Sequence, residues 1–149
     1  MFGDKPIVGC QKAKMDAKGR ITIPIFSGIQ AHESGLVISR ISPVEGIICV
    51  QIQKADRFSK RIAELKKLRD TLTDTVEIEN AYRELVNLCI DTDSIDASVD
   101  GQNRMLLPAK LRKDVFGEHA ELIVKGAYDS LYIFPSEDAY NTFMEERQK

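Results

Sequence analysis

Two short segments of the chain carry the same pattern, an aspartate followed four residues later by an arginine. They are Asp16-Ala17-Lys18-Gly19-Arg20 and Asp100-Gly101-Gln102-Asn103-Arg104. An Asp carboxylate accepts hydrogen bonds from the amides that follow it, and Gly takes a positive φ, so the pattern is typical of a tight hairpin turn. An arginine at such a turn could bind a phosphate or the edge of a guanine. It could equally pair with the Asp across the loop and serve only the turn, so both interpretations stay open.

Basic residues gather around the first segment. Residues 5–20 hold five basic residues and one acid, which gives a net charge of +4. Cations at alternate positions of a strand share one face, and a positive β-ribbon face can lie against phosphates or enter a major groove. The cations at alternate positions are Lys12, Lys14, Lys18 and Arg20. The second segment has one cation, Arg104, and follows the acidic residues 91–96, so its role could be structural or an interface.

The two segments belong to an internal repeat that organises the chain. The Asp, the Arg and a following Pro recur at one offset of 84 residues, as Asp16, Arg20 and Pro24, then Asp100, Arg104 and Pro108. The same offset aligns the apolar residues 46–50 with 130–134. Two copies of one unit therefore fill the chain.

Each copy is predicted to hold strands and a short helix that begins at its proline, because proline lacks an amide but suits a first helical turn. The first copy is predicted to contain a strand over 7–15, a turn over 16–19, a return strand over 21–23, a helix from Pro24 through Ile29, and a hairpin of strands 36–40 and 47–52. The second is predicted to contain a helix from Pro108 to Gly117, strands over 122–125 and 130–134, and a last helix over 136–147 with Ser136 as its N-cap. In the first strand, the candidate inward positions are Val8, Cys10, Ala13 and Met15.

Two helices are predicted between the copies. Apolar residues at helical spacing mark a helix over about 56–72 and a second one that carries residues 78–89. Residues 54–70 have a net charge of +4, and residues 74–100 have a net charge of −7. We expect an antiparallel helical hairpin with complementary charge, in preference to nucleic-acid binding by the basic helix.

The composition of the 149 residues excludes several functional classes. The chain shows no glycine-rich phosphate loop, no nucleophile beside a base and no clustered ligand set, so we expect no enzyme, no metal and no cofactor. The net charge of −2 neither indicates nor excludes a nucleic-acid partner. The sequence contains no apolar stretch of about 20 residues and no signal peptide, so a cytoplasmic protein without a membrane partner is expected.

The few cysteines and histidines suggest no chemistry. The three cysteines, Cys10, Cys49 and Cys89, lie far apart and are expected to be reduced and buried in apolar segments. His32 and His119 are expected at the surface or at caps.

Together these residues resemble the MraZ family. The resemblance rests on Met1-Phe2 at the start, on Asp16 to Arg20 followed by Pro24, and on Asp100 with Arg104, Pro108, Leu111 and Arg112. It implies a DNA-binding transcriptional regulator linked to the bacterial division and cell-wall gene cluster, with units similar to the swapped-hairpin barrels of the AbrB and SpoVT transcription factors. It further implies a homo-oligomeric ring that binds short direct repeats of double-stranded DNA in its own promoter region, in the cytoplasm and associated with the nucleoid.

The resemblance also implies which residues contact DNA. The family's DNA-binding arginine falls on Arg20, with Lys18 beside it, and its second-motif arginine falls on Arg104. Two positions depart from the family pattern. Asn103 replaces the usual Gly of the second loop, which Asn can imitate because it tolerates left-handed geometry. Ser27-Gly28 stands where the first unit usually carries a helix arginine after its Pro.

The sequence thus predicts an α+β fold of two tandem, pseudo-symmetric swapped-hairpin β-barrel units with flanking helices. The boundaries are a first unit over 1–53, a helical hairpin over 54–92, and a second unit with a C-terminal helix over 93–149. The predicted DNA-binding residues are Lys14, Lys18, Arg20 and Arg104. The alternative is an interaction or scaffold protein, or an antitoxin-like partner protein, whose helical hairpin binds another protein.

Overall fold

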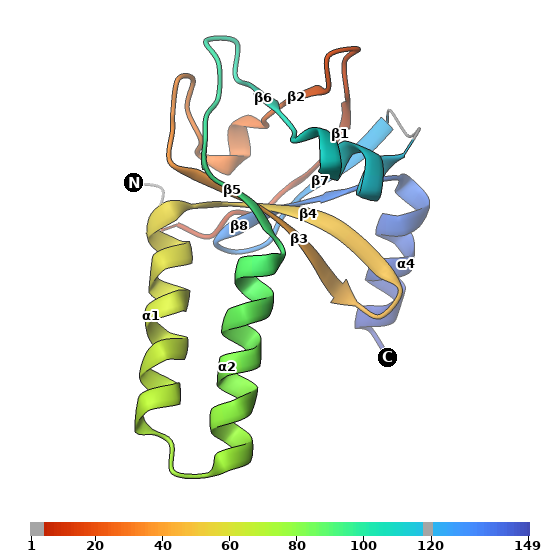
Figure 1. Cartoon of the computed structure of the whole chain (residues 1–149). Helices are drawn as coiled ribbons and strands as arrows, with labels where there is room; N and C mark the ends of the chain where they lie inside the picture. Colours follow the sequence, from red (N-terminus) through yellow and green to blue (C-terminus); the bar gives the residue numbers. More distant parts are fainter. Residues whose placement is uncertain (1–4, 118–120) are drawn as a thin grey trace.

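Antiparallel sheets and four α-helices form an α+β fold in the computed structural model, which describes residues 5–117 and 121–149 (Figure 1). The α+β class is therefore confirmed. The elements in chain order are β1 (Cys10–Lys14), β2 (Arg20–Thr22), η2 (Ile25–Ser27), β3 (Leu36–Val44), β4 (Ile47–Lys54), α1 (Ala55–Thr71), α2 (Thr75–Ile90), β5 (Thr92–Ala97), β6 (Arg104–Leu106), α3 (Ala109–Leu111), η3 (Arg112–Phe116), β7 (Glu121–Gly126), β8 (Ser130–Phe134) and α4 (Glu137–Arg147). Met1, Phe2 and His119, whose roles were considered above, lie outside the described residues.

The larger sheet has six strands in the order β1-β7-β8-β4-β3-β5, and every neighbouring pair is antiparallel. The predicted hairpins are confirmed as β3–β4 and β7–β8. β3 runs further than expected, to Val44, with a register shift after Ile41. β5 was not predicted, because its alternation of polar and acidic residues lacks the apolar face that marks a strand.

The pairing expected of the first hairpin is wrong. The turn at 16–19 forms, but the strands on either side of it do not pair as one ladder. β1 pairs with β7 and β2 pairs with β6, so each finds its partner in the other copy of the repeat. The pairing of β2 with β6 sets Ile21 opposite Met105, and both side chains are fully buried. Burial of two equivalent apolar residues side by side favours this exchange over a local ladder.

The larger sheet separates two apolar clusters. Alternation along β7 sends Leu122 and Val124 into the main core and Ile123 into a smaller cluster on the other face, where Phe143 of α4 covers it. The main core draws residues from both copies of the repeat, including Ile21, Ile23 and their counterparts Met105 and Leu107. The two copies therefore share one core. The division into units at residues 53 and 92 stays a prediction.

The helices begin and end close to the predicted residues. α1 and α2 form the expected antiparallel hairpin, which extends away from the sheet (Figure 1), and Arg61 Nη2 lies 2.9 Å from Glu84 Oε1 across it. The predicted Ser136 cap of α4 is confirmed, since its Oγ accepts from the Ala139 amide at 3.1 Å. The helix expected after Pro24 is only the single 3-10 turn η2, because Gly28 ends it at a φ of 75°.

Several burial predictions for the first strand and the cysteines are wrong. Ala13 packs against the core as expected, and so does Met15, but Val8 and Cys10 are exposed. Gly9, at a φ of 134°, interrupts the extended backbone before β1, so the alternation does not continue through it. Among the cysteines, Cys49 is buried and burial raises the pKa of its thiol to about 12, whereas Cys10 and Cys89 are exposed.

Candidate nucleic-acid interface

The first Asp–Arg segment is a loop held by one carboxylate. Asp16 Oδ1 accepts from the backbone amides of Lys18 at 2.9 Å and Arg20 at 2.8 Å. Asp16 Oδ2 accepts from the Nε of Arg20 at 2.8 Å. Gly19 completes the turn at a φ of 85°, a left-handed conformation that glycine adopts without strain.

The second segment repeats this network atom for atom. Asp100 Oδ1 accepts from the amides of Gln102 and Arg104, both at 2.9 Å, and Oδ2 accepts from Arg104 Nε at 2.9 Å. Asn103 takes a φ of 61°, so it does imitate the glycine of the first loop. The repeat found in the sequence is therefore a repeat of local structure.

The carboxylates of Asp16 and Asp100 accept these hydrogen bonds in their ionised form. The backbone amide of Arg20 contributes most to lowering the pKa of Asp16, and the Arg20 guanidinium adds to this effect. The Arg104 amide and guanidinium lower the pKa of Asp100 in the same way. Each loop is therefore a preformed ion pair at neutral pH.

The arginines pair with their aspartates, as the structural interpretation of the motif expected, but only through Nε. Within residues 5–117 and 121–149, the terminal Nη groups of Arg20 and Arg104 donate no hydrogen bond. Both side chains are partly exposed, at 27% for Arg20 and 30% for Arg104. The Asp thus fixes the guanidinium plane and leaves its outer edge available to a ligand.

The pairing of β2 with β6 brings the two arginines onto one surface. In this antiparallel pair, Arg20 lies opposite Leu106 and Thr22 lies opposite Arg104. Opposed residues share a face, and so do residues two apart, so these four side chains share the face that points away from buried Ile21 and Met105. We call this surface, formed by Arg20, Thr22, Arg104 and Leu106, the arginine ribbon. Arg20 is the first residue of β2 and Arg104 is the first residue of β6. The two arginines lie roughly 7 Å apart along the strand direction.

Backbone bonds tie each loop to the other copy. The Leu107 amide donates to the Gly19 carbonyl at 3.1 Å, and the Ile23 amide donates to the Asn103 carbonyl at 2.8 Å. These two bonds are equivalent under the offset of 84 residues. Both loops extend from the end of the molecule that lies opposite the α1–α2 hairpin (Figure 1).

One arginine from the second copy braces the first loop. Arg112 donates from Nε to the Leu107 carbonyl at 3.1 Å and from Nη1 to the Lys18 carbonyl at 3.4 Å. Its guanidinium covers Gly19, where an added Cβ would collide with it. Gly19 is therefore needed for this close approach as well as for its φ.

The second loop is braced by a different residue. Position 28, the counterpart of Arg112, is a glycine, and the carbonyl of Ile23 is instead bonded by Asn103 Nδ2 at 2.8 Å. Asn103 thus supplies the left-handed turn and the support that an arginine gives elsewhere. His32 packs against Gly101 from the surface.

The predicted lysines flank the first loop. Lys14 ends β1 and Lys18 lies in the turn, and both are exposed. Neither makes an ion pair with any residue that the structure describes, whereas Lys12 lies 3.5 Å from Glu137. The structure therefore places Arg20 and Arg104 on one face of the β2–β6 pair, with Lys18 in the turn before Arg20 and Lys14 at the end of β1.

Sequence reasoning missed the other members of the ribbon. Thr22 and Leu106 carry no motif of their own, and their place depends on the pairing of β2 with β6. The available signal was the repeat itself, since equivalent short strands after equivalent turns can pair about a pseudo-two-fold axis.

Other kinds of site find no support in the described ranges. No group of three or more His, Cys, Asp or Glu side chains there is arranged to hold a metal ion. None of the helices in those ranges combines the length and apolar character required to span a membrane.

Comparison with known proteins finds similarity to MraZ proteins. The family model described as "MraZ protein, putative antitoxin-like" matches residues 94–149, which include the second loop. A "Transcriptional regulator MraZ" of Azotobacter vinelandii is 28% identical over 117 residues, which cover 76% of this chain and 66% of that protein. A second protein with this name, from Rhodospirillum rubrum, is 28% identical over 109 residues, covering 72% of this chain and 65% of that protein.

The chain is therefore similar to MraZ proteins, through the family model over residues 94–149 and through these two relatives over about three quarters of its length. The matched regions span just under two thirds of the length of these curated relatives.

Proposed function

We propose that this chain is a sequence-specific DNA-binding transcriptional regulator and that the arginine ribbon with its two loops is the surface that contacts double-stranded DNA. The observation that carries the proposal is the pair of arginines on one exposed face, each held through Nε by an Asp and each with its Nη groups unbonded in the described structure. Arginine in a fixed orientation suits the paired acceptors O6 and N7 of guanine. A two-stranded ribbon is also one of the elements that fit a major groove.

The residues divide into two roles under this proposal. Arg20 and Arg104 contact base edges, because their charge is already balanced by an adjacent Asp and their geometry is fixed. Lys14 and Lys18 contact phosphates, since they are exposed and lack an ion pair in the described residues. The asymmetry of charge around the two loops makes the first one the stronger contact.

The finer architecture belongs to the same proposal. Two tandem swapped-hairpin units, with the boundaries predicted from the sequence, are supported by the exchange of β1 and β2 between the copies and by the equivalent bonds at Gly19 and Asn103. Assembly as a ring, binding to direct repeats in the promoter of the division and cell-wall gene cluster, and a cytoplasmic, nucleoid-associated location are supported by the family resemblance.

A titration of labelled DNA from just upstream of this protein's own gene tests the proposal. A duplex of the same length and composition in scrambled order is the control, and both are measured at two salt concentrations. We expect the upstream DNA to bind at least about 1,000-fold more tightly than the scrambled duplex, which is the lower end of the usual range for specific recognition. Equal affinity for the two duplexes would contradict sequence-specific binding.

One observation favours a second candidate, a protein-binding role for the α1–α2 hairpin. The hairpin extends from the body (Figure 1) and exposes apolar side chains at Leu68, Val76 and Tyr82. A family description that includes the word antitoxin agrees with a protein partner. Leu68→Ser, Val76→Ser and Tyr82→Ser together remove these side chains. Under our proposal the triple variant keeps the DNA affinity of the wild type. Under the second candidate it loses its binding to a protein partner.

A further inference from the structure

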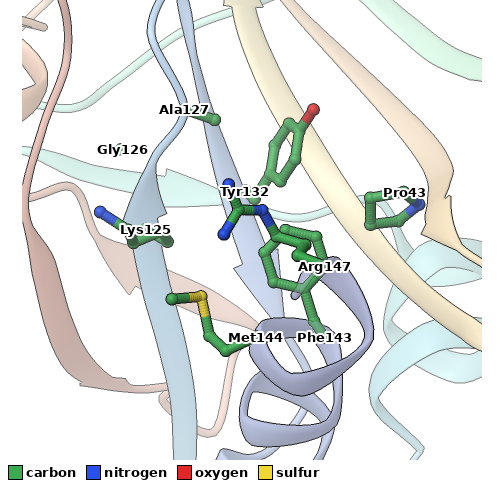
Figure 2. Close-up of a pocket in the computed structure, with 8 residues that line it drawn as sticks. All are labelled: Pro43, Lys125, Gly126, Ala127, Tyr132, Phe143, Met144 and Arg147. Carbon is green, nitrogen blue, oxygen red and sulfur yellow. The ribbon is translucent and has the colours of Figure 1, made fainter. Parts of the chain in front are cut away.

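A cleft of about 590 Å³ lies beside α4, on the sheet face that carries the smaller apolar cluster (Figure 2). Its volume falls within the range of small-molecule sites. Four elements and one turn surround it. The lining residues are Pro43, Lys125, Gly126, Ala127, Tyr132, Phe143, Met144 and Arg147.

Two cations line this cleft. Among the described residues that line it, none is acidic. Lys125 Nζ has a single protein partner in the described structure, the Gly9 carbonyl at 3.2 Å, although an ammonium can donate three hydrogen bonds. Arg147 is exposed and has no carboxylate partner in the described residues, while Glu146 beside it is bonded to Lys149 at 2.9 Å.

The floor of the cleft is aromatic. The Arg147 guanidinium lies 5.7 Å from the centroid of the Phe143 ring, a cation–π contact that holds the arginine over the cleft. Tyr132 meets Phe143 edge to face, with centroids 6.4 Å apart. The hydroxyl of Tyr132 makes no hydrogen bond within the described residues, and Tyr132 lines the cleft together with Arg147 (Figure 2).

We propose that this cleft binds a small planar aromatic anion, such as an aromatic carboxylate. The ring of the ligand lies against Phe143 and Met144, and its carboxylate accepts hydrogen bonds from Arg147 and Lys125. Arginine presents a fork that matches a carboxylate, and thioether sulfur packs well against aromatic rings. This site is separate from the arginine ribbon and stands whether or not the chain binds DNA.

Methyl NMR of the full chain with 13C-labelled methionine tests the site, with 2-naphthoate as the probe and the uncharged 2-naphthamide as its matched control. Met144 lines the cleft, whereas Met15 and Met105 belong to the main core and serve as internal references. We expect 2-naphthoate to shift the Met144 methyl signal saturably, with a Kd of about 1 mM or tighter. The references should stay in place, and 2-naphthamide should bind about tenfold more weakly.

Charge-removing variants locate the contact. Arg147→Gln and Lys125→Gln should each weaken 2-naphthoate binding by about tenfold. Lys149→Gln removes the same charge two residues beyond the end of α4, outside the lining residues, and should change the Kd less than twofold. Absence of a saturable Met144 shift, equal binding of the amide, or full affinity in Arg147→Gln and Lys125→Gln would overturn the proposal.

Discussion

Each Asp–Arg pair determines how its arginine can contribute to binding. Asp16 holds Arg20 in place, so the guanidinium gives up little side-chain entropy when it meets a ligand. The same Asp balances the charge of the arginine, which weakens its attraction to a bare phosphate. The pair therefore favours oriented contacts with base edges, and long-range attraction depends on the lysines.

The first prediction concerns those lysines. Lys14→Ala combined with Lys18→Ala should reduce the slope of log affinity against log salt by about 0.9 for each phosphate that a lysine no longer neutralises. Lys12→Ala is the matched control, because Lys12 is already paired with Glu137 and should leave the slope unchanged. Anisotropy titrations over a salt series measure both. A wild-type slope in the double variant would show that these lysines only solvate the strand.

The second prediction concerns acid stability. The pKa values of Asp16 and Asp100 are lowered in the folded chain from an ordinary value of 3.8. The resulting stabilisation is present above pH 3.8 and is lost as the pH falls from there through the lowered values. Urea unfolding between about pH 5 and pH 2 should show a smaller loss of stability in Asp16→Asn/Asp100→Asn than in the wild type. Identical pH profiles would exclude the two loops as acid-sensitive elements.

At the scale of elements, much of the fold could be predicted because its signals are local. Helical spacing located α1 and α2, proline marked the start of α3, and Ser136 marked the start of α4. The partners of β1 and β2 could not be predicted from local signals, since β1 pairs with residues 121–125 and β2 pairs with residues 104–106, both in the other copy of the repeat.

The same limit applied to the candidate site. Turn chemistry identified Asp16, Arg20 and their counterparts, because each loop is closed by its own residues. The presence of both arginines on one face depends on the register between β2 and β6. The residues next to each arginine in the sequence do not determine that register.

The third prediction concerns the brace of the second loop. Asn103→Gly should lower the free energy of unfolding by about 1 kcal/mol, because it removes the hydrogen bond to the Ile23 carbonyl. Gly28→Arg, added to that variant, should not restore this stability, because Gly28 has a left-handed backbone with a φ of 75°, whereas Arg112 is right-handed helical with a φ of −58°. Urea unfolding of the single and double variants measures both effects. Full recovery of stability in the double variant would contradict this account of the two braces.

At the scale of the whole molecule, the loops and the α1–α2 hairpin lie at opposite ends (Figure 1). A subunit built in this way could join others while its loops stay directed toward DNA. One chain offers two loops, and several chains held together could bind repeated boxes with a higher effective concentration.

The fourth prediction follows from that assembly. Light scattering should report a multiple of 16.8 kDa. Inserting about five base pairs between two boxes should weaken binding more than inserting about ten, because ten base pairs restore the groove to the same side of the duplex. A monomer that binds one box as tightly as several would contradict the ring.

The most direct test of the central claim is the affinity of Arg20→Ala/Arg104→Ala for the upstream DNA, measured beside the wild type with folding checked by circular dichroism. An arginine bound to a guanine contributes about 1–3 kcal/mol, so the double variant should bind the upstream DNA at least about tenfold more weakly. Its affinity for the scrambled duplex should change far less, because the lysines remain. A folded double variant with wild-type affinity and wild-type preference for the upstream DNA would contradict the assignment of the arginine ribbon as the DNA-binding surface.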